Sequence, residues 1–399
     1  MEPAPLNGLR VVDLTSTFMG PYCTLLLRQW GADVVKVESP QGDVVRYIGD
    51  RNGTGMGPIF LNANRGKRSV GLDLKRDGSR AVLRHLLDVS DIVVHSLRPA
   101  AARRLGLAPA DVLADNPRIG YLGFRGYGPG GPYEDLPAYD DVIQAASGTA
   151  ALQAADGESA YVRSSMADKT VGLMGAAAVL AALHGRDASG LGQVVEIPMY
   201  ETMVGFNLLE QQSGRVFEPA AGPSGYPRTQ SPHRKPYRTK DGAIAVMVYT
   251  DDQWRVFFDE VGRSELIQDP RFRTIRERTI HSDELYSLVE SAMVVRTTDE
   301  WLEQLRLIGI AASRVNSLDD LFTEPHLAAT GFFHSVDHPT EGRLVLPSMP
   351  GPVGDDEGRW LAPWLGQHTR AVMGELGYGS DEISALFDQR VLFSGAPSS

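Results

Sequence analysis

The sequence contains a single cysteine, Cys23. One thiol cannot form a disulfide within the chain, so the fold depends on its core, and a reducing compartment is expected. Cys23 itself is expected to be a buried core residue. The chain has 399 residues, of which 42% are hydrophobic. This is enough to bury a large core and to form two or more domains.

Long apolar runs are also missing. The run nearest in length to a membrane span, residues 171–183, is too short, and the N-terminus lacks the basic start and apolar run of a signal peptide. The formal net charge is -11 and the lysines and arginines are scattered. No surface for nucleic acid or for an anionic membrane is therefore expected. We predict a soluble, cytoplasmic protein whose partners are small molecules.

Metal-binding motifs are absent as well. His233, His326 and His368 occur without HxxH or HExxH spacing, and no cysteine cluster accompanies them. The sequence therefore predicts no metal site.

The first hundred residues alternate between short apolar strands and helices. Strands are predicted at residues 9–14, 32–37, 69–74 and 91–96, with helices at 21–30 and 78–87. This alternation predicts an α/β fold whose Rossmann-like large domain has a parallel sheet flanked by helices. Such sheets bind ligands beyond the carboxyl ends of their strands, which indicates the loops after Leu14, Val37, Leu74 and His95. The first loop, TSTFMGPYCT, lacks a GxGxxG pattern, so a dinucleotide is not expected.

Asp168 is the strongest candidate for a catalytic residue. It precedes residues 169–184, which are rich in Ala, Leu and Met and predict a buried helix with Asp168 at its N-cap. First-turn amides and the helix dipole would keep the carboxylate ionised at neutral pH, so that it could act as a nucleophile without a helper base. Because aspartate is a common helix cap, a purely structural role is the alternative. Residues 193–198 follow as a short strand.

Several segments resemble the family III CoA-transferases, in unbroken order over most of the chain. These are LNGLRVVDLT followed by Gly20 and Pro21, GADVVKVESPQGD, NANRGKRSVGLDLK, DIVVHSLRPAAARRLGL, NPRIGYLGFRGYGPGGPYEDLPAYDDVIQAASG, the Asp168 helix with GQVVEIPMYE, and APWLGQHTRAVMGELGYGSDEISAL. The same fold family includes formyl-CoA and carnitine-type CoA-transferases and α-methylacyl-CoA racemases, so fold alone does not decide the reaction.

Tyr139 distinguishes the two reactions. Racemases of this family typically have a histidine in a GHD-like segment, whereas this chain has Tyr139 in PAYD, which resembles the transferase pattern. A neutral tyrosine is a poor base near neutral pH, so racemisation is less favoured. The alternative role of Tyr139 is packing.

The resemblance implies an enzyme that moves CoA from an acyl-CoA donor to a carboxylic acid acceptor. Asp168 would attack the donor thioester to give a mixed anhydride, and the CoA thiolate would convert this into an aspartyl-CoA thioester. The acceptor would take the CoA through a second anhydride. An acyl-CoA racemase or epimerase is the alternative, followed by a non-catalytic acyl-CoA-binding protein. CoA thioesters are expected as substrates, with no permanently bound cofactor.

The resemblance also implies which residues bind CoA. Arg104 is the expected phosphate contact, because a guanidinium makes paired hydrogen bonds with phosphate. Leu72, Ser96, Leu97 and Arg98 are expected along the path of CoA. Basic residues of the family are replaced by Ser39, Pro40 and Pro137, which predicts that Arg46 or Lys75 contributes instead.

Thr17, Phe18, Tyr139 and Gly128 are the expected substrate-binding residues. The loop GYGPGG, which contains Gly128, is expected to bring backbone amides close to the substrate. Phe18 occupies the place of a glutamine in formyl-specific enzymes, which argues against a small polar acyl group.

Four regions are expected along the chain: a large CoA-binding domain at residues 1–217, a linker at 218–236, a small α/β domain at 237–335, and a C-terminal segment at 336–399 that returns to the large domain. A helix is predicted at 200–212. Within the small domain, a strand is predicted at 242–250 and helices at 253–261, 282–294 and 298–308. The resemblance implies an interlocked homodimer, in which the LGQHT segment at 365–369 packs on the large domain of the partner subunit.

Overall fold

The computed structural model describes residues 4–154, 157–349, 351 and 357–395. Positions 1–3, 155–156, 350, 352–356 and 396–399, which fall within the predicted large domain and C-terminal segment, lie outside the described residues. The chain divides into two compact units. The large unit comprises residues 1–153, 161–205 and 331–399, and the small unit comprises residues 154–160 and 206–330.

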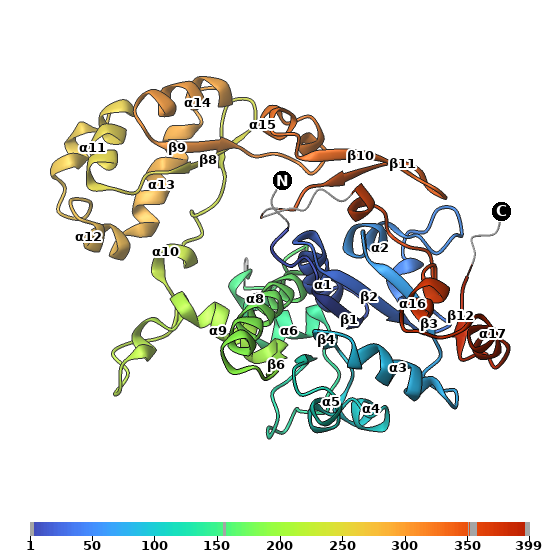
Figure 1. Ribbon diagram of the computed structural model, residues 1–399. Coiled ribbons are helices and arrows are strands. Elements are labelled where there is room, and N and C mark those ends of the chain that lie inside the picture. The colour runs from blue at the N-terminus through green and yellow to red at the C-terminus, as the bar shows by residue number, and fades with distance from the viewer. Residues whose placement is uncertain (1–3, 155–156, 350, 352–356, 396–399) are drawn as a thin grey trace. The chain divides into compact units, whose positions relative to one another are not determined.

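The large unit is built on a seven-stranded sheet with the order β12-β3-β2-β1-β4-β5-β6 (Figure 1). The strands are β1 (Arg10–Leu14), β2 (Asp33–Glu38), β3 (Arg68–Leu72), β4 (Ile92–His95), β5 (Gly120–Arg125), β6 (Val194–Pro198) and β12 (Leu392–Phe393). All neighbours are parallel except β12, which runs antiparallel to β3. The α/β class and the large parallel sheet are thus confirmed, and β12 makes the sheet mixed.

Helices cover both faces of this sheet (Figure 1). The helices of this part of the chain are α1 (Met19–Gln29), α2 (Pro58–Ala63), α3 (Ser79–Asp88), α4 (Pro99–Arg104), α5 (Pro109–Asp115), α6 (Asp140–Ala146), α7 (Thr149–Leu152), α8 (Met166–Ser189), α9 (Met199–Gln211), α16 (Thr369–Glu375) and α17 (Ser380–Asp388), with 3-10 turns η1 (Val44–Arg46) and η5 (Glu357–Trp360). Successive side chains of a strand point to opposite faces. Val12 and Val35 accordingly pack with α3 and α16, whereas Val11 and Val34 pack with α1 and α8. Cys23 lies fully buried in the second of these cores, as predicted.

α8 is the helix that carries Asp168. It packs against α1, α6, β5 and β6 in the large unit. It begins at Met166, with Ser165 as its N-cap, three residues earlier than predicted. Among the described helices, α8 alone has the length and mean hydropathy of a membrane span, which the sequence pattern did not indicate. Core helices share these properties, and its packing assigns α8 to the core of the large unit.

The C-terminal segment returns to the large unit of its own chain. The hairpin β10 (Phe333–His338) and β11 (Gly342–Pro347) is antiparallel. The following LGQHT segment lies on β3, where the Gly366 amide donates to Ser69 Oγ at 2.8 Å and Thr369 Oγ1 accepts from the Gly71 amide at 2.9 Å. These bonds attach the segment to the sheet of its own chain, and its contact with a partner subunit stays a prediction.

The small unit contains a three-stranded antiparallel sheet and a group of helices. Its strands β7 (Tyr237–Arg238), β8 (Ala243–Met247) and β9 (Ala311–Arg314) occur in the order β7-β8-β9. Its helices are α10 (Pro227–Gln230), α11 (Asp251–Glu260), α12 (Ile275–Ile280), α13 (Ser282–Met293), α14 (Thr298–Leu307) and α15 (Pro325–Ala329), with turns η2 (Ser213–Val216), η3 (Ser264–Gln268) and η4 (Asp320–Phe322). Trp254, Phe257, Phe258 and Trp301 fill its core. The boundary between the units falls within α9.

Candidate active site

A cavity of about 260 Å³ lies at the carboxyl ends of β1, β4 and β5 in the large unit. The strand order reverses between β1 and β4, and sheets of this type bind ligands at such a switch point. Five predicted site residues line the cavity: Thr17, Ser96, Arg98, Tyr139 and Asp168. The other lining residues are Ser16, Met19, Phe124, Arg125, Gly126, Leu136, Pro137, Ala138, Asp140 and Met199.

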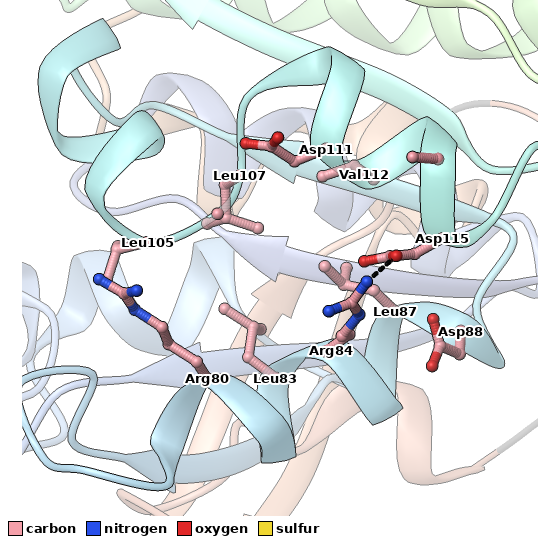
Figure 2. A pocket seen from close by; sticks show the side chains of 12 residues that line it. Arg80, Leu83, Arg84, Leu87, Asp88, Leu105, Leu107, Asp111, Val112 and Asp115 are labelled. Atoms are coloured by element: carbon pink, nitrogen blue, oxygen red, sulfur yellow. Dashed lines mark hydrogen bonds and ion pairs between the residues drawn. The ribbon is translucent and has the colours of Figure 1, made fainter.

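A second cavity, of about 400 Å³, lies between α3 and residues 105–115 (Figure 2). Leu83, Leu87 and Val112 form its apolar floor, and the Arg84 guanidinium pairs with the Asp115 carboxylate across it. None of the predicted site residues lines this cavity. Although it is larger, its lining acids Asp88 and Asp111 are exposed, and no residue at the end of a parallel strand lines it.

Asp168 lies in the first turn of α8 and not at its N-cap. Its amide donates a hydrogen bond of 2.9 Å to Oδ1 of Asp140, whose Oδ2 accepts from Gln144 Nε2 at 2.6 Å. The Asp168 carboxylate accepts no hydrogen bond from the part of the chain that the structure describes. The predicted capping role is therefore wrong. The Asp168 side chain instead lines the cavity.

The ionisation expected for Asp168 is also corrected. Burial raises the pKa of the Asp168 carboxyl to about 7, and the charges of Asp140 and Asp141 act in the same direction. Lys169 opposes them. Burial disfavours a charge and a like charge nearby disfavours it further. At neutral pH the carboxyl of the free protein is therefore only partly ionised.

Thr17 lies in the loop that joins β1 to α1 and has a φ of 72°. This left-handed conformation costs a residue with a Cβ roughly 1–2 kcal/mol. Two contacts hold it in place: the Thr17 amide donates to Asp43 Oδ1 at 3.0 Å, and Lys36 pairs with Asp43 Oδ2 at 3.1 Å. Lys36 Nζ also donates to the Thr15 carbonyl at 2.9 Å. Asp43 and Lys36 thus hold the strained loop in this conformation.

Asp43 and Lys36 belong to a buried cluster of charges beneath this loop. Asp13 and Lys67 form a second pair at 3.1 Å, and both are almost fully buried. Burial alone would raise the pKa of Asp13, but Lys67 and Lys36 hold it below its usual range. Burial lowers the pKa of Lys67 to about 8, against the opposing effect of Asp13. Each charge of the cluster therefore depends on its partner.

Glu38 and Arg46 complete this cluster. Arg46 Nε and Nη2 donate to the two Glu38 oxygens at 2.8 and 2.7 Å, and both side chains are buried. Arg46 therefore cannot be the substitute phosphate contact that the sequence suggested. Lys75, the other residue suggested, is exposed and does not line the cavity.

Arg125 is a lining residue that the sequence analysis missed. It ends β5, its Nε donates to Glu196 Oε1 at 2.8 Å, and its Nη1 lies 3.5 Å from Glu134. The available signal was its position at the end of a parallel strand, beside the ends of β4 and β6. Asp140 belongs to the PAYD motif, but the sequence predicts no function for it.

The glycine loop differs from the expectation. The Gly128 amide donates to Glu201 Oε1 at 2.9 Å, and the Gly130 amide donates to Glu134 Oε2 at 2.9 Å. A Cβ at position 128 would lie 2.8 Å from the same Glu201 oxygen. These glycines therefore allow a close approach of acidic side chains, and the two amides do not face the cavity.

The predicted CoA contacts are only partly brought together. Ser96 and Arg98 line the cavity, whereas Leu72 is buried in the core and Leu97 packs against that core. Arg104, which ends α4, is exposed and lies outside the cavity lining. Its carbonyl accepts a hydrogen bond from Arg80.

Of the predicted substrate contacts, Phe18 is half-buried at the N-cap of α1 and does not line the cavity, so the structure gives no support to its effect on acyl specificity. Tyr139 is 68% exposed at the N-cap of α6, which contradicts a packing role. Within the described ranges, no group of three or more His, Cys, Asp or Glu side chains could hold a metal ion.

The cavity lies at the switch point of a parallel sheet, where α/β proteins of this type bind ligands, and comparison with known proteins gives the family. The model of CoA-transferase family III matches residues 6–369. The chain therefore belongs to CoA-transferase family III, and the resemblance of its motifs is confirmed.

Similar proteins include transferases from several organisms. The probable fatty acyl-CoA transferase Rv3272 of Mycobacterium tuberculosis is 32% identical over 81% of this chain and 86% of its own length. The succinyl-CoA–L-malate CoA-transferase beta subunit of Chloroflexus aurantiacus is 30% identical over 97% and 98%, respectively.

Solved structures agree with these sequence matches. A crystal structure of a mutant of Rv3272 superposes with a TM-score of 0.81 at 28% identity, covering 93% of this chain and 99% of the other. A CAIB/BAIF family protein from Brucella suis has a TM-score of 0.77 at 28% identity, covering 94% and 100%.

Proposed function

We propose that the protein transfers CoA from an acyl-CoA donor to a carboxylic acid, with Asp168 as the nucleophile. The observation that carries this proposal is the Asp168 carboxyl at the switch-point cavity, without a hydrogen-bond donor from the described residues. A structural aspartate would be capped or paired, whereas this one is available to a substrate. The named relatives that transfer CoA support the same reaction.

The first half of the reaction places CoA on the protein. An Asp168 oxygen attacks the thioester carbon of the donor, the carbon–sulfur bond breaks, and CoA leaves as a thiolate, which gives a mixed anhydride. The thiolate then attacks the aspartyl carbon, and the donor leaves as a carboxylate. The product is an aspartyl-CoA thioester, and no water is consumed.

The second half returns CoA to a new acid. The acceptor carboxylate attacks the aspartyl carbon and releases the thiolate, which gives a second anhydride. The thiolate then attacks the acceptor carbonyl carbon, and the Asp168 carboxylate leaves in its original form. Each step exchanges one acyl bond for another, so the cycle needs no additional reactant.

The cavity is suited to these anhydrides. Phe124 and Met199 are buried beside it, and Met19 and Leu136 add apolar surface. Such walls exclude water, which would otherwise hydrolyse an anhydride. The same burial that protects the intermediate raises the pKa of Asp168.

Intact mass spectrometry tests the proposal. The native protein is incubated with a panel of acyl-CoA donors that includes fatty acyl-CoA and succinyl-CoA. We expect an adduct with the mass of CoA less water, which hydroxylamine removes by forming a hydroxamate and free CoA. Asp168→Ala should form none. Asp141→Asn, which removes a neighbouring exposed charge but keeps the nucleophile, should still form it.

A racemase or epimerase acting on acyl-CoA is the second candidate. It is favoured by the pKa of about 7 for Asp168 and by the neighbouring Asp140, because a carboxyl near neutrality can both remove and return a proton. Incorporation of solvent deuterium at the α-carbon of a consumed acyl-CoA, without any protein adduct, would replace the transferase proposal with this one.

We also propose a homodimer. Leu173, Met174 and Leu180 are exposed on α8 although they are large and apolar. Large apolar side chains left exposed along one helix are typical of a protein interface. Light scattering coupled to size-exclusion chromatography would give twice the mass of the chain, and a monomer at micromolar concentration would contradict the proposal.

A further inference from the structure

His95 ends β4 and is only 4% exposed. Its Nδ1 accepts a hydrogen bond from the Leu97 amide at 3.2 Å, and its Nε2 lies 2.5 Å from Oη of Tyr121 on β5. The Tyr121 hydroxyl in turn donates to the Leu107 carbonyl at 2.9 Å. Two buried side chains thus connect two points of the backbone that are ten residues apart.

The direction of each hydrogen bond is fixed by chemistry. A backbone amide can only donate, so Nδ1 of His95 carries no proton and the ring is the neutral Nε2–H form. Nε2 therefore donates to the Tyr121 oxygen, which leaves the Tyr121 proton for the Leu107 carbonyl. Burial, together with the charge of Arg125, lowers the pKa of His95 to about 4, which keeps this neutral form at physiological pH.

The two anchored points enclose the segment that carries most of the expected CoA contacts. Residues 97 and 107 flank α4, and Ser96 and Arg98 line the candidate cavity at the start of the segment. Arg104 lies at its end. The Leu97 amide fixes one end of the segment to the sheet, and the Leu107 carbonyl fixes the other.

We propose that His95 and Tyr121 are positioning residues that clamp residues 96–107 in the conformation that binds CoA. This inference rests on the proposed function, because the clamp matters only if the protein binds CoA and residues 96–107 contact it. Neither side chain lines the cavity, so both act through the backbone that they hold. A segment held before binding loses less conformational freedom when the ligand arrives, which favours tight binding.

Three variants separate the two ends of the clamp. Tyr121→Phe keeps the ring and removes the hydroxyl, so the bonds to Leu107 and to His95 Nε2 are lost while the bond from His95 to the Leu97 amide remains. His95→Leu removes the Leu97 end and the link between the two side chains, while Tyr121 can still donate to Leu107. His95→Asn is the conservative variant, because an asparagine side chain can accept a hydrogen bond from the amide two residues later and so restores the Leu97 end.

His338 provides a matched control. It is also 4% exposed, its Nδ1 accepts from the amide two residues later, Thr340, at 3.3 Å, and its Nε2 lies 3.0 Å from the Ala362 carbonyl. It lies at the end of β10 and does not line the candidate cavity. His338→Leu therefore removes an equivalent pair of bonds from a different part of the large unit.

The measurements are the dissociation constant of free CoA by calorimetry and the hydrogen exchange of peptides covering residues 96–107. Loss of one such hydrogen bond corresponds to a change of about fivefold. We expect exchange and the CoA dissociation constant to rise about fivefold in Tyr121→Phe and by a similar factor in His95→Leu, with partial recovery in His95→Asn. The turnover rate at saturating CoA ester should change little, so KM rises while kcat is retained.

The outcomes distinguish this inference from the proposed function. If the native chain does not bind CoA, the proposed function fails and the clamp fails with it. If the native chain binds CoA but Tyr121→Phe and His95→Leu bind it equally well, only the clamp is overturned. An equal loss of affinity in His338→Leu would show a general loss of stability and would also overturn it. Should His95→Leu not fold, Tyr121→Phe carries the test.

Discussion

Replacing the proposed nucleophile should stabilise the protein. Asp168→Asn keeps the shape of the side chain and removes a charge that burial and Asp140 disfavour. The pKa of about 7 compares with an ordinary value of 3.8. At about 1.4 kcal/mol for each unit of pKa, the ionised carboxylate costs at most about 4 kcal/mol of folding free energy. Solvent screening of the half-buried group reduces this to roughly 2 kcal/mol.

The direction of the pKa shift of Asp168 determines the pH at which Asp168→Asn is more stable than the native protein. The folded protein binds the Asp168 proton more tightly than the unfolded chain does, because the pKa of the folded state is the higher one. The cost of the charge is therefore absent below pH 4, grows between pH 4 and 7, and is complete above pH 7. Asparagine has no such dependence, so the two proteins should differ little at acidic pH and most at pH 8.

Thermal unfolding at pH 4.5 and pH 8 measures this difference. We expect Asp168→Asn to unfold roughly 2–5 °C above the native protein at pH 8 and close to it at pH 4.5. Asp381→Asn serves as the control, since Asp381 lies in the first turn of α17 and is exposed. A variant that is less stable than the native protein at pH 8, or an equal difference at both pH values, would refute the reasoning.

Three further predictions address activity and packing. Turnover should rise with pH through about 7 as Asp168 ionises, and Asp140→Asn should move the midpoint of the kcat/KM profile to lower pH, because it removes a like charge. Lys67→Met removes the ion-pair partner of the buried Asp13 and should lower the free energy of unfolding by about 3 kcal/mol, measured by urea titration with the Asp13→Asn, Lys67→Met double variant as control. Gly172→Ala would place a Cβ 2.7 Å from the Met19 carbonyl and should cost about 1–3 kcal/mol, whereas Gly205→Ala, with no atom within 4 Å, should not.

The strands of the large unit could be predicted because their signals are local. β1, β2 and β4 are short apolar runs bounded by polar or turn residues, and each lies within one or two residues of its predicted range. The antiparallel edge strand β12 could not be predicted, because two residues carry no periodicity and its pairing with β3 depends on contacts over more than 300 positions. Long-range pairing of this kind is a property of the assembled fold.

The start of α8 shows how a local signal can be misread. The prediction took Asp168 as the cap, yet Ser165 stands three residues earlier and is equally suited to capping. The wrong start of the helix also gave the wrong ionisation state for Asp168. A capping carboxylate is stabilised by amides, whereas a first-turn carboxylate beside Asp140 is not. The start of the helix therefore decides whether amides cap Asp168, while burial and the charges of Asp140 and Asp141 raise its pKa.

The composition of the site could be predicted only where single residues carry the chemistry. Asp168, Tyr139 and Thr17 were recognised from the motifs around them, and the cavity brings them together. The contacts of Asp140, Arg125 and the buried charge cluster depend on which strand ends are neighbours, which the sheet order alone determines. A sequence therefore predicts the reactive residues more readily than the residues that position them.

The high pKa of Asp168 and its proposed chemistry have one physical origin. An anhydride intermediate requires a site without water, and a site without water disfavours the carboxylate that must form the anhydride. Cations near Asp168 would relieve this conflict, but Arg125 already pairs with Glu196. Lys169 acts to lower the pKa and Arg98 lines the cavity, so these two remain the cations best placed to favour the ionised form. Because Arg98 belongs to the segment that His95 and Tyr121 clamp, binding of CoA and ionisation of Asp168 would depend on the same stretch of backbone.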